Sequence, residues 1–193
     1  MLFAPRQEIK DMQTFAQYLE RWHDFYMLAG TAAATLIGLL FVSLTLSIEV
    51  MSDESQIGLK ELATQTFASF LYVLLISLLL LIPDHNPKLI GVEILILGTF
   101  GLANATRHIQ PVIGHLQATW AKTYLFWRFT MPTASYVGLI VIAFAVWRGR
   151  HDGLFSLVYV VFILLITATH NAWDLLVGIS KRKLGVFPFS KSP

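Results

Sequence analysis

Apolar residues in this chain form five long blocks that are separated by short polar stretches. Each block reaches the length of about 20 residues that an α-helix needs to cross a bilayer. Within a block the apolar residues follow one another, whereas a soluble amphipathic helix would carry a polar face. The pattern therefore predicts an all-α integral membrane protein, a bundle of five transmembrane helices. The predicted spans are residues 24–49, 61–82, 88–108, 124–147 and 154–179.

The segments outside the five spans predict a leader, short connections and a tail. Residues 1–23 combine acidic side chains with apolar positions at helical spacing, which favours a short interfacial helix over a signal peptide. A solvated helical leader fits the same pattern. Residues 109–123 form the only long connection, for which a surface loop is the simplest prediction and an interfacial or re-entrant segment the alternative. Residues 180–193 are predicted to be a basic, flexible tail of this single membrane domain.

The composition agrees with a membrane protein and narrows its partners. The chain has 193 residues, of which 55% are hydrophobic and 13% are charged, whereas soluble domains carry about 25% charged residues. It has no cysteine, which excludes disulfides and thiolate metal sites. A net charge of +2 gives no reason to expect nucleic acid as a partner. The lipid bilayer is the partner that the composition implies.

Small residues at helical spacing mark two faces at which membrane helices are expected to pack closely. They are Gly30, Ala34 and Gly38 in the first span and Gly91, Gly98 and Ala105 in the third. Close approach of two backbones is a main source of helix association in lipid. The face in the first span is therefore predicted to meet another helix, either from the same chain or from a second copy.

Polar side chains are concentrated in one half of the predicted membrane. Five spans place the two termini on opposite sides, here named side A for the amino-terminal side and side B for the other. Each span, followed through the bilayer, then contributes polar residues to the side-B half, and Glu93 is the main exception in the side-A half. Ionisable groups at membrane depth are costly, so they indicate a functional site by default.

The polar residues near side B predict a wet vestibule that binds or passes ions or small solutes. This side-B vestibule consists of Arg107, His108, Arg128, His170, Asn171 and Asp174. His170 and Asp174 are four residues apart and therefore share a helix face. Glu93 is a separate candidate for binding a proton or a cation. The alternative is a structural role, in which these residues form interhelical ion pairs and hydrogen bonds and the arginines reach the headgroups.

Two further function classes fit the sequence. A structural or regulatory subunit would bind a larger membrane protein through the Gly30 face of the first span. A membrane-embedded hydrolase would hold a metal through His170, Asp174 and His108, whose nitrogen and oxygen donors suit zinc or iron. The chain has no His-Glu-x-x-His, Gly-x-Ser-x-Gly or phosphate-binding glycine motif. Because these signatures are absent, the sequence identifies no cofactor and favours a role other than catalysis.

Three stretches resemble a family of small, uncharacterised bacterial membrane proteins with several spans. They are FYMLAGTAAATLIGLLFV at 25–42, Gly91-x-Glu93, and NAW-x-LLV at 171–177. The resemblance covers most of the chain and implies a helical membrane fold and a bacterial origin, but no activity. The family is expected to carry an apolar residue where this chain has Asp174, so the pair of His170 and Asp174 is a departure from its pattern.

Localisation and assembly are predicted from the same features. Lysine and arginine residues are nearly balanced between the two sides, so the positive-inside rule gives no clear orientation. The cluster Lys181, Arg182 and Lys183 after the last span favours side B as the cytoplasmic side. The sequence thus predicts a multi-pass protein of the bacterial inner membrane. Five helices enclose little volume, so we expect copies to associate and any continuous path to run between them.

Overall fold

A computed structural model describes residues 6–47, 57–83, 87–114, 119–148 and 153–183 of the chain. Their side chains are described at position 17 and at 19–47, 59–83, 88–107, 130–148 and 154–180. These residues form helices α1 (Arg6–Thr45), α3 (Ile57–Leu81), α4 (Pro87–Gly114), α5 (Thr119–Trp147) and α6 (Gly153–Lys183), and no strand occurs among them.

Each helix contains a stretch that is long and apolar enough to cross a membrane. The five stretches are Leu19–Thr45, Leu59–Leu81, Lys88–Arg107, Thr130–Trp147 and Leu154–Ser180. In each of them the carbonyl and N–H groups are paired within the helix, which is the condition for an α-helix to lie in lipid. The predicted fold class of a helical, multi-pass membrane protein is therefore confirmed.

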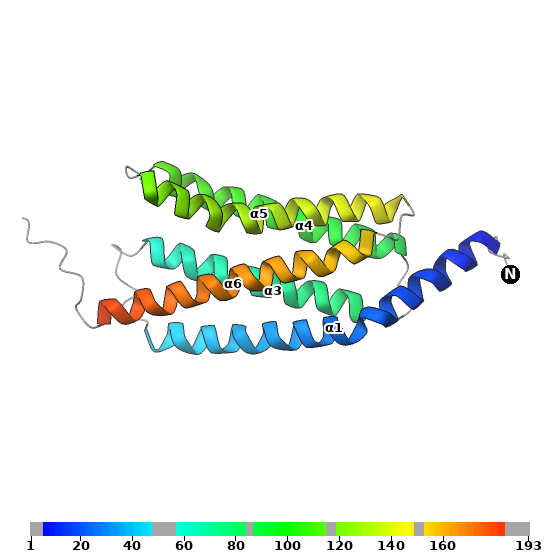
Figure 1. Ribbon diagram of the computed structural model, residues 1–193, viewed down its shortest axis with the longest axis horizontal. Coiled ribbons are helices and arrows are strands. Elements are labelled where there is room, and N and C mark those ends of the chain that lie inside the picture. Colours follow the sequence, from blue (N-terminus) through cyan, green and yellow to red (C-terminus); the bar gives the residue numbers. More distant parts are fainter. Residues whose placement is uncertain (1–5, 48–56, 84–86, 115–118, 149–152, 184–193) are drawn as a thin grey trace, which may run out of the picture.

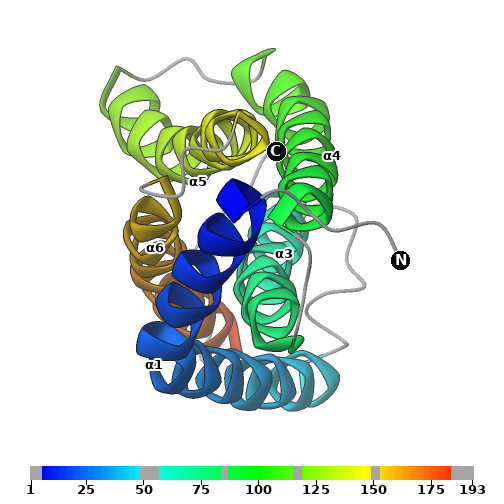
Figure 2. The ribbon, with the colours of Figure 1, turned by 90° about the vertical axis from the view of Figure 1, so that its right-hand side faces the viewer.

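The helices run side by side along the long axis of the molecule (Figure 1). Successive helices run in opposite directions, so α1 begins at one end of the bundle and α6 finishes at the other. The end at which α1 enters corresponds to side A, and the opposite end corresponds to side B. Figure 2 shows α3 and α6 in the middle of the bundle, with α1 on one side and the pair of α4 and α5 on the other.

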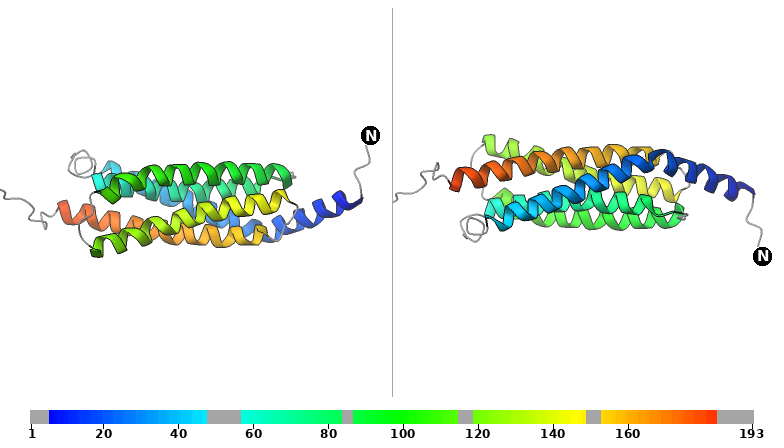
Figure 3. Two further views of the ribbon diagram at one scale, coloured as in Figure 1. Left: turned by 90° about the horizontal axis from the view of Figure 1, so that it is seen from above. Right: turned by 90° about the horizontal axis from the view of Figure 1, so that it is seen from below.

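Helix α1 joins the predicted leader and the predicted first span in one element. It has 40 residues and is therefore about 60 Å long, roughly twice the thickness of the hydrocarbon core. Both views of Figure 3 show its first turns extending beyond the other helices. The structure thus places no helix boundary near residue 23, and the location of the leader at a membrane interface stays a prediction.

The connection between the third and fourth spans is shorter than the sequence suggested. Helix α4 continues to Gly114 and α5 already begins at Thr119. The prediction of a surface loop is therefore wrong for residues 109–114 and 119–123. Residues 115–118 lie outside the described residues. A proline removes only one backbone hydrogen bond. Helix α4 continues past Pro111 just as α5 continues past Pro132. The basic residues 181–183, which were predicted to belong to the tail, likewise lie in a helix, in the last turn of α6.

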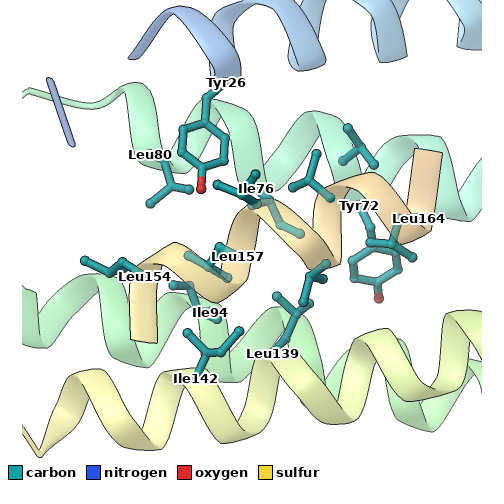
Figure 4. Packing of buried hydrophobic residues seen from close by; sticks show 14 of the residues in the cluster. Tyr26, Tyr72, Ile76, Leu80, Ile94, Leu139, Ile142, Leu154, Leu157 and Leu164 are labelled. Atoms are coloured by element: carbon teal, nitrogen blue, oxygen red, sulfur yellow. The ribbon is translucent and has the colours of Figure 1, made fainter. Parts of the chain in front are cut away.

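The largest apolar cluster lies toward side A and receives side chains from all five helices. Figure 4 shows Ile76 of α3, Ile94 of α4, Leu139 of α5 and Leu157 of α6 meeting there. These four side chains are fully buried. A separate small cluster lies toward side B and, among the described residues, contains only α1, α3 and α6 side chains; it consists of Leu40, Leu59, Ala63, Leu175 and Ile179. The apolar core is thus much larger near side A.

Candidate polar vestibule near side B

Three contacts show which residues of neighbouring helices lie at the same height in the bundle. A Cβ atom on Gly178 of α6 would lie 3.5 Å from Leu59 of α3. The rings of Tyr72 in α3 and Tyr136 in α5 are 4.8 Å apart between centroids. Tyr136 also covers Gly101 of α4, where a Cβ atom would lie 2.6 Å from the ring.

These contacts bring the predicted vestibule positions of α4 and α6 to one height. Thr66 of α3 and Asn171 of α6 are each seven residues inward from the contact of Leu59 with Gly178. Following α3, α4 and α5 six residues toward side B from Tyr72, Gly101 and Tyr136 leads to Thr66, Arg107 and Thr130. Four helices therefore contribute a polar residue at this height, which lies about 10 Å inward from Leu59 along α3.

Two of the predicted residues lie close to this height by their positions in the helices. His108 follows Arg107 in α4, and Arg128 lies two residues beyond Thr130 toward side B in α5. Both are helical, but their side chains fall outside the described residues. The Arg107 side chain is exposed.

One edge of α6 contacts α5 toward side A and carries polar residues toward side B. Val160 of α6 packs against Gly138 of α5, where a Cβ atom would lie 3.5 Å away. Thr167 and Asp174 follow Val160 at steps of seven residues, so the three side chains lie along one edge of the helix. Asp174 therefore continues, toward side B, the edge that Val160 presents to α5.

His170 and Asp174 come together as the spacing predicts. The Nε2 atom of His170 lies 3.7 Å from the Oδ2 atom of Asp174, and the two side chains are 69% and 26% exposed. The imidazole and the carboxylate can thus supply a proton donor and an acceptor at one place on α6. This distance is an ion-pair contact when the imidazole is protonated and is too long for a strong hydrogen bond.

Asn171 points to a different face of α6 and lies inside the bundle. It is only 1% exposed, and its Nδ2 atom has no hydrogen-bond partner. The structure thus divides the predicted set on α6 into a surface pair, the exposed His170 with the partly exposed Asp174, and a buried amide. An unpaired buried amide group is costly where no water is present, so packing and hydrogen bonds among the described residues do not account for this position of Asn171.

Glu93 does not belong to the side-B vestibule. It is partly buried in α4 and precedes Arg107 by 14 residues, which corresponds to about 21 Å along the helix. The structure therefore separates Glu93 from the other candidates, as its predicted position near side A requires.

A group of polar residues on α3 was not among the sequence-based predictions. Gln65, Ser69 and Tyr72 lie at positions i, i+4 and i+7 and therefore share one helix face, the face on which Tyr72 meets Tyr136 of α5. The Tyr136 hydroxyl is hydrogen-bonded to Ser69, whereas the Tyr72 hydroxyl is buried without a hydrogen-bond partner. Helical spacing of polar residues within an apolar span was the signal that would have identified this face.

Other buried hydroxyl groups near side B are satisfied within their own helices. Thr66, Ser69 and Ser135 each donate a hydrogen bond to the carbonyl four residues earlier, at 2.7, 3.0 and 3.1 Å. Such bonds let a hydroxyl remain in an apolar region without an external partner. These three residues are consistent with the alternative in which the polar side chains near side B have a structural role. That alternative does not explain Asn171 and Tyr72, whose buried polar atoms have no hydrogen-bond partner.

Of the small residues of the first span, one packs against α3 and two lie on the exposed surface of α1. Gly30 packs on α3, where a Cβ atom would lie 3.0 Å from Cβ of Ser77. Ala34 is exposed, and a Cβ atom on Gly38 would meet nothing within 4 Å. One end of the predicted face thus serves packing within the chain, and the other end remains open.

The small residues of the third span face α5. A Cβ atom on Gly91 would lie 3.4 Å from the carbonyl oxygen of Ala143, and one on Gly98 would lie 3.2 Å from the backbone nitrogen of Ile140. Ala105 is partly buried and packs at the edge of the large apolar cluster. The absence of side chains at the two glycines lets the α4 and α5 backbones approach closely.

Metal ligation would need further donors beside the pair on α6. The part of the chain whose side chains are described contains no group of three histidine, aspartate or glutamate side chains arranged to hold a metal ion. His108 lies outside that part.

Comparison with protein-family models, with curated proteins and with solved structures finds no match to this chain. The function of the protein must therefore be inferred from its own residues.

Proposed function

We propose that this multi-pass membrane protein binds ions or small solutes in the side-B vestibule. The observation that carries the proposal is the unequal distribution of polar and apolar side chains along the bundle. Toward side A the five helices meet in a continuous apolar cluster. Toward side B, Asn171, Asp174 and Arg107 lie within a few residues of one height, and the edge of α6 that contacts α5 toward side A carries polar residues.

The geometry of a single copy supports binding more than passage. A path from the vestibule to side A would have to cross the layer that contains Ile76, Leu139 and Leu164, all fully buried. An ion without its water shell is strongly disfavoured in such surroundings. If the protein conducts, the path therefore runs between copies.

The surface pair on α6 is the proposed contact for a charged ligand. The Asp174 carboxylate attracts cations, and the neighbouring His170 supplies an acceptor or, when protonated, a donor. Arg107, at nearly the same height on α4, supplies positive charge. We place the protein in the bacterial inner membrane with side B in the cytoplasm, which rests on the family resemblance and on the basic residues 181–183.

Equilibrium binding to the purified full-length protein tests this proposal, with rubidium, chloride and phosphate as radiolabelled probes. We expect saturable binding of at least one probe and at least a tenfold loss of affinity in Asp174→Ala, as for a lost charged contact of about 1.4 kcal/mol. Thr99→Ala is the matched control, because Thr99 is exposed on α4 and donates only to carbonyls of its own helix. Absence of saturable binding of all three probes, or equal losses in both variants, would contradict the proposal.

A second candidate is a subunit that associates with another membrane helix through α1. It is favoured by the open surface at Gly38 and by the satisfied hydroxyl groups beside it: Thr31 and Thr35 donate to carbonyls four residues earlier at 2.8 and 2.9 Å. A surface with small side chains and no unpaired donors suits close helix packing in lipid. If this face binds a copy or a partner, Gly38→Ile lowers the native mass in detergent, whereas Leu39→Ile at the neighbouring exposed position leaves it unchanged.

A further inference from the structure

Two buried polar atoms near side B have no hydrogen-bond partner, and they come from different helices. They are Nδ2 of Asn171 in α6 and the hydroxyl oxygen of Tyr72 in α3. The two side chains are 1% and 5% exposed. In lipid, water does not reach such groups from outside the protein, so each unpaired group costs several kcal/mol. Native proteins normally satisfy such groups with ordered water or a ligand.

The two atoms lie at successive heights in the bundle, and we group Asn171 of α6 with Ser69 and Tyr72 of α3 as an inner polar strip. Asn171 is level with Thr66 of α3, and Tyr72 lies six residues further inward, about 9 Å along the helix. Ser69 lies between them on the α3 face that carries Tyr72 and hydrogen-bonds Tyr136. The strip leads inward from the height of Arg107, where the proposed vestibule lies.

The strip ends where the large apolar cluster begins. The rings of Tyr72 and Tyr136 contact each other at a tilt of 56°, with centroids 4.8 Å apart, and both tyrosines belong to that cluster. In Figure 4, Tyr72 lies at the edge of the labelled group, opposite Leu154 and Leu80, which are near side A. The tyrosine pair therefore closes the strip toward side A.

We infer that the side-B vestibule continues inward as a narrow site for uncharged hydrogen-bonding molecules, bounded by Asn171, Ser69 and Tyr72 and closed by the tyrosine pair. This inference rests on the proposed function and adds the class of molecule that the inner part accepts. Asn171, Ser69, Tyr72 and Tyr136 are all neutral, so they do not compensate a desolvated ion. They offer both donors and acceptors, which suits water or a small hydroxylated or amide solute.

The absence of cysteine from the chain allows a direct test with two single variants in α3, Ser69→Cys and Ser77→Cys. Both serines are fully buried, and the Ser77 hydroxyl also has no hydrogen-bond partner. Ser77, however, packs against Gly30 of α1 and lies eight residues beyond Ser69 toward side A, outside the strip. A thiol in dry, apolar surroundings remains protonated and reacts slowly, because the thiolate is the nucleophile. We expect the uncharged reagent hydroxyethyl methanethiosulfonate to modify Ser69→Cys at least tenfold faster than Ser77→Cys in the full-length protein.

Equal rates at the two positions, whether slow or fast, would overturn the inference. Adding Asn171→Leu to Ser69→Cys provides a second measurement, because an apolar side chain of similar size at the entrance should slow the modification at least tenfold. An unchanged rate would also count against the site. If molar glycerol or urea slows the modification of Ser69→Cys more than that of a free thiol, the occupant is a solute. If the modification rate does not change, the occupant is water. Both outcomes support the site.

The cysteine rates and the ion-binding measurements separate the two proposals. Fast modification of Ser69→Cys without binding of rubidium, chloride or phosphate would retain the inner site and reject the ion-binding function. Ion binding with equally slow modification of both cysteines would retain the function and reject the inner site.

Discussion

Replacement of Gly101 by alanine is expected to destabilise the bundle, because α4 approaches the Tyr136 ring so closely there. A Cβ atom at this position would lie 2.6 Å from Cδ1 of Tyr136 and 2.9 Å from both Cε1 and Cγ. Carbon atoms in favourable contact are about 3.5–4.0 Å apart, so the ring and the helix must separate by roughly 1 Å. Rotation of the ring does not relieve the clash, because Cγ lies on the rotation axis. The Tyr72 ring packs against the same ring, with centroids 4.8 Å apart, and limits its movement.

The expected cost is about 3 kcal/mol relative to the same substitution at a helical glycine that is not crowded. Overpacking a filled core typically costs about 1–3 kcal/mol, and three ring atoms are crowded here, which favours the upper part of that range. The higher helix propensity of alanine offsets about 1 kcal/mol. Gly138→Ala in α5 is the control, because it makes the same change of propensity and its Cβ would lie at an ordinary contact distance, 3.5 Å from Val160. The propensity term therefore cancels between the two variants.

Equilibrium unfolding in mixed detergent micelles, followed by circular dichroism, measures this difference. About 3 kcal/mol corresponds to roughly a hundredfold difference in the unfolding equilibrium constant. In a double-mutant cycle, Tyr136→Ala should remove most of the penalty of Gly101→Ala, because the clashing ring is absent. Equal stabilities of Gly101→Ala and Gly138→Ala, or an undiminished penalty in the Tyr136→Ala background, would refute the packing argument.

Three further variants test other contacts by the same unfolding measurement. Relative to Gly138→Ala, Gly98→Ala should cost about 1–3 kcal/mol, because its Cβ would lie 3.2 Å from the backbone nitrogen of Ile140; equal stabilities of these two variants would contradict the close approach of α4 and α5. Gly30→Ala should be destabilising by a similar amount and be partly rescued by Ser77→Gly, which removes the Cβ atom 3.0 Å away; the absence of any coupling would exclude that contact. Asn171→Leu should destabilise by about 1–3 kcal/mol if the amide binds water or a solute, whereas a stabilised variant would show that the amide is dry and unpaired.

The fold was predictable from the sequence because the length and composition of apolar blocks determine where helices span a membrane. The five spans in the structure agree with the predicted ones to within a few residues at most boundaries. The larger differences lie where helices continue beyond the apolar region, at the start of α1 and at the connection of α4 with α5. At those places hydropathy carries no information, since a helix outside lipid needs no apolar block.

The arrangement of the polar site was only partly predictable. The spacing of His170 and Asp174 required a shared face, and the structure places the two side chains 3.7 Å apart. Spacing alone did not show that Asn171 is buried while His170 is exposed, because this depends on which neighbours cover α6. The contact of Tyr72 with Tyr136 depends on the relative heights of α3 and α5, which a single sequence does not specify.

The central claim is that hydrophilic side chains gather at the side-B end of a bundle whose helices cross the membrane five times. Site-specific labelling of Asp174→Cys in sealed vesicles, with a charged thiol reagent that does not cross the bilayer, tests it most directly. Ser180→Cys, exposed in the last turns of α6, marks side B, and Gln17→Cys, exposed before the first span, marks side A. We predict that Asp174→Cys is labelled from the side that labels Ser180→Cys and is protected from the side that labels Gln17→Cys. Labelling of Asp174→Cys from the Gln17 side, or labelling of all three from one side, would contradict the account.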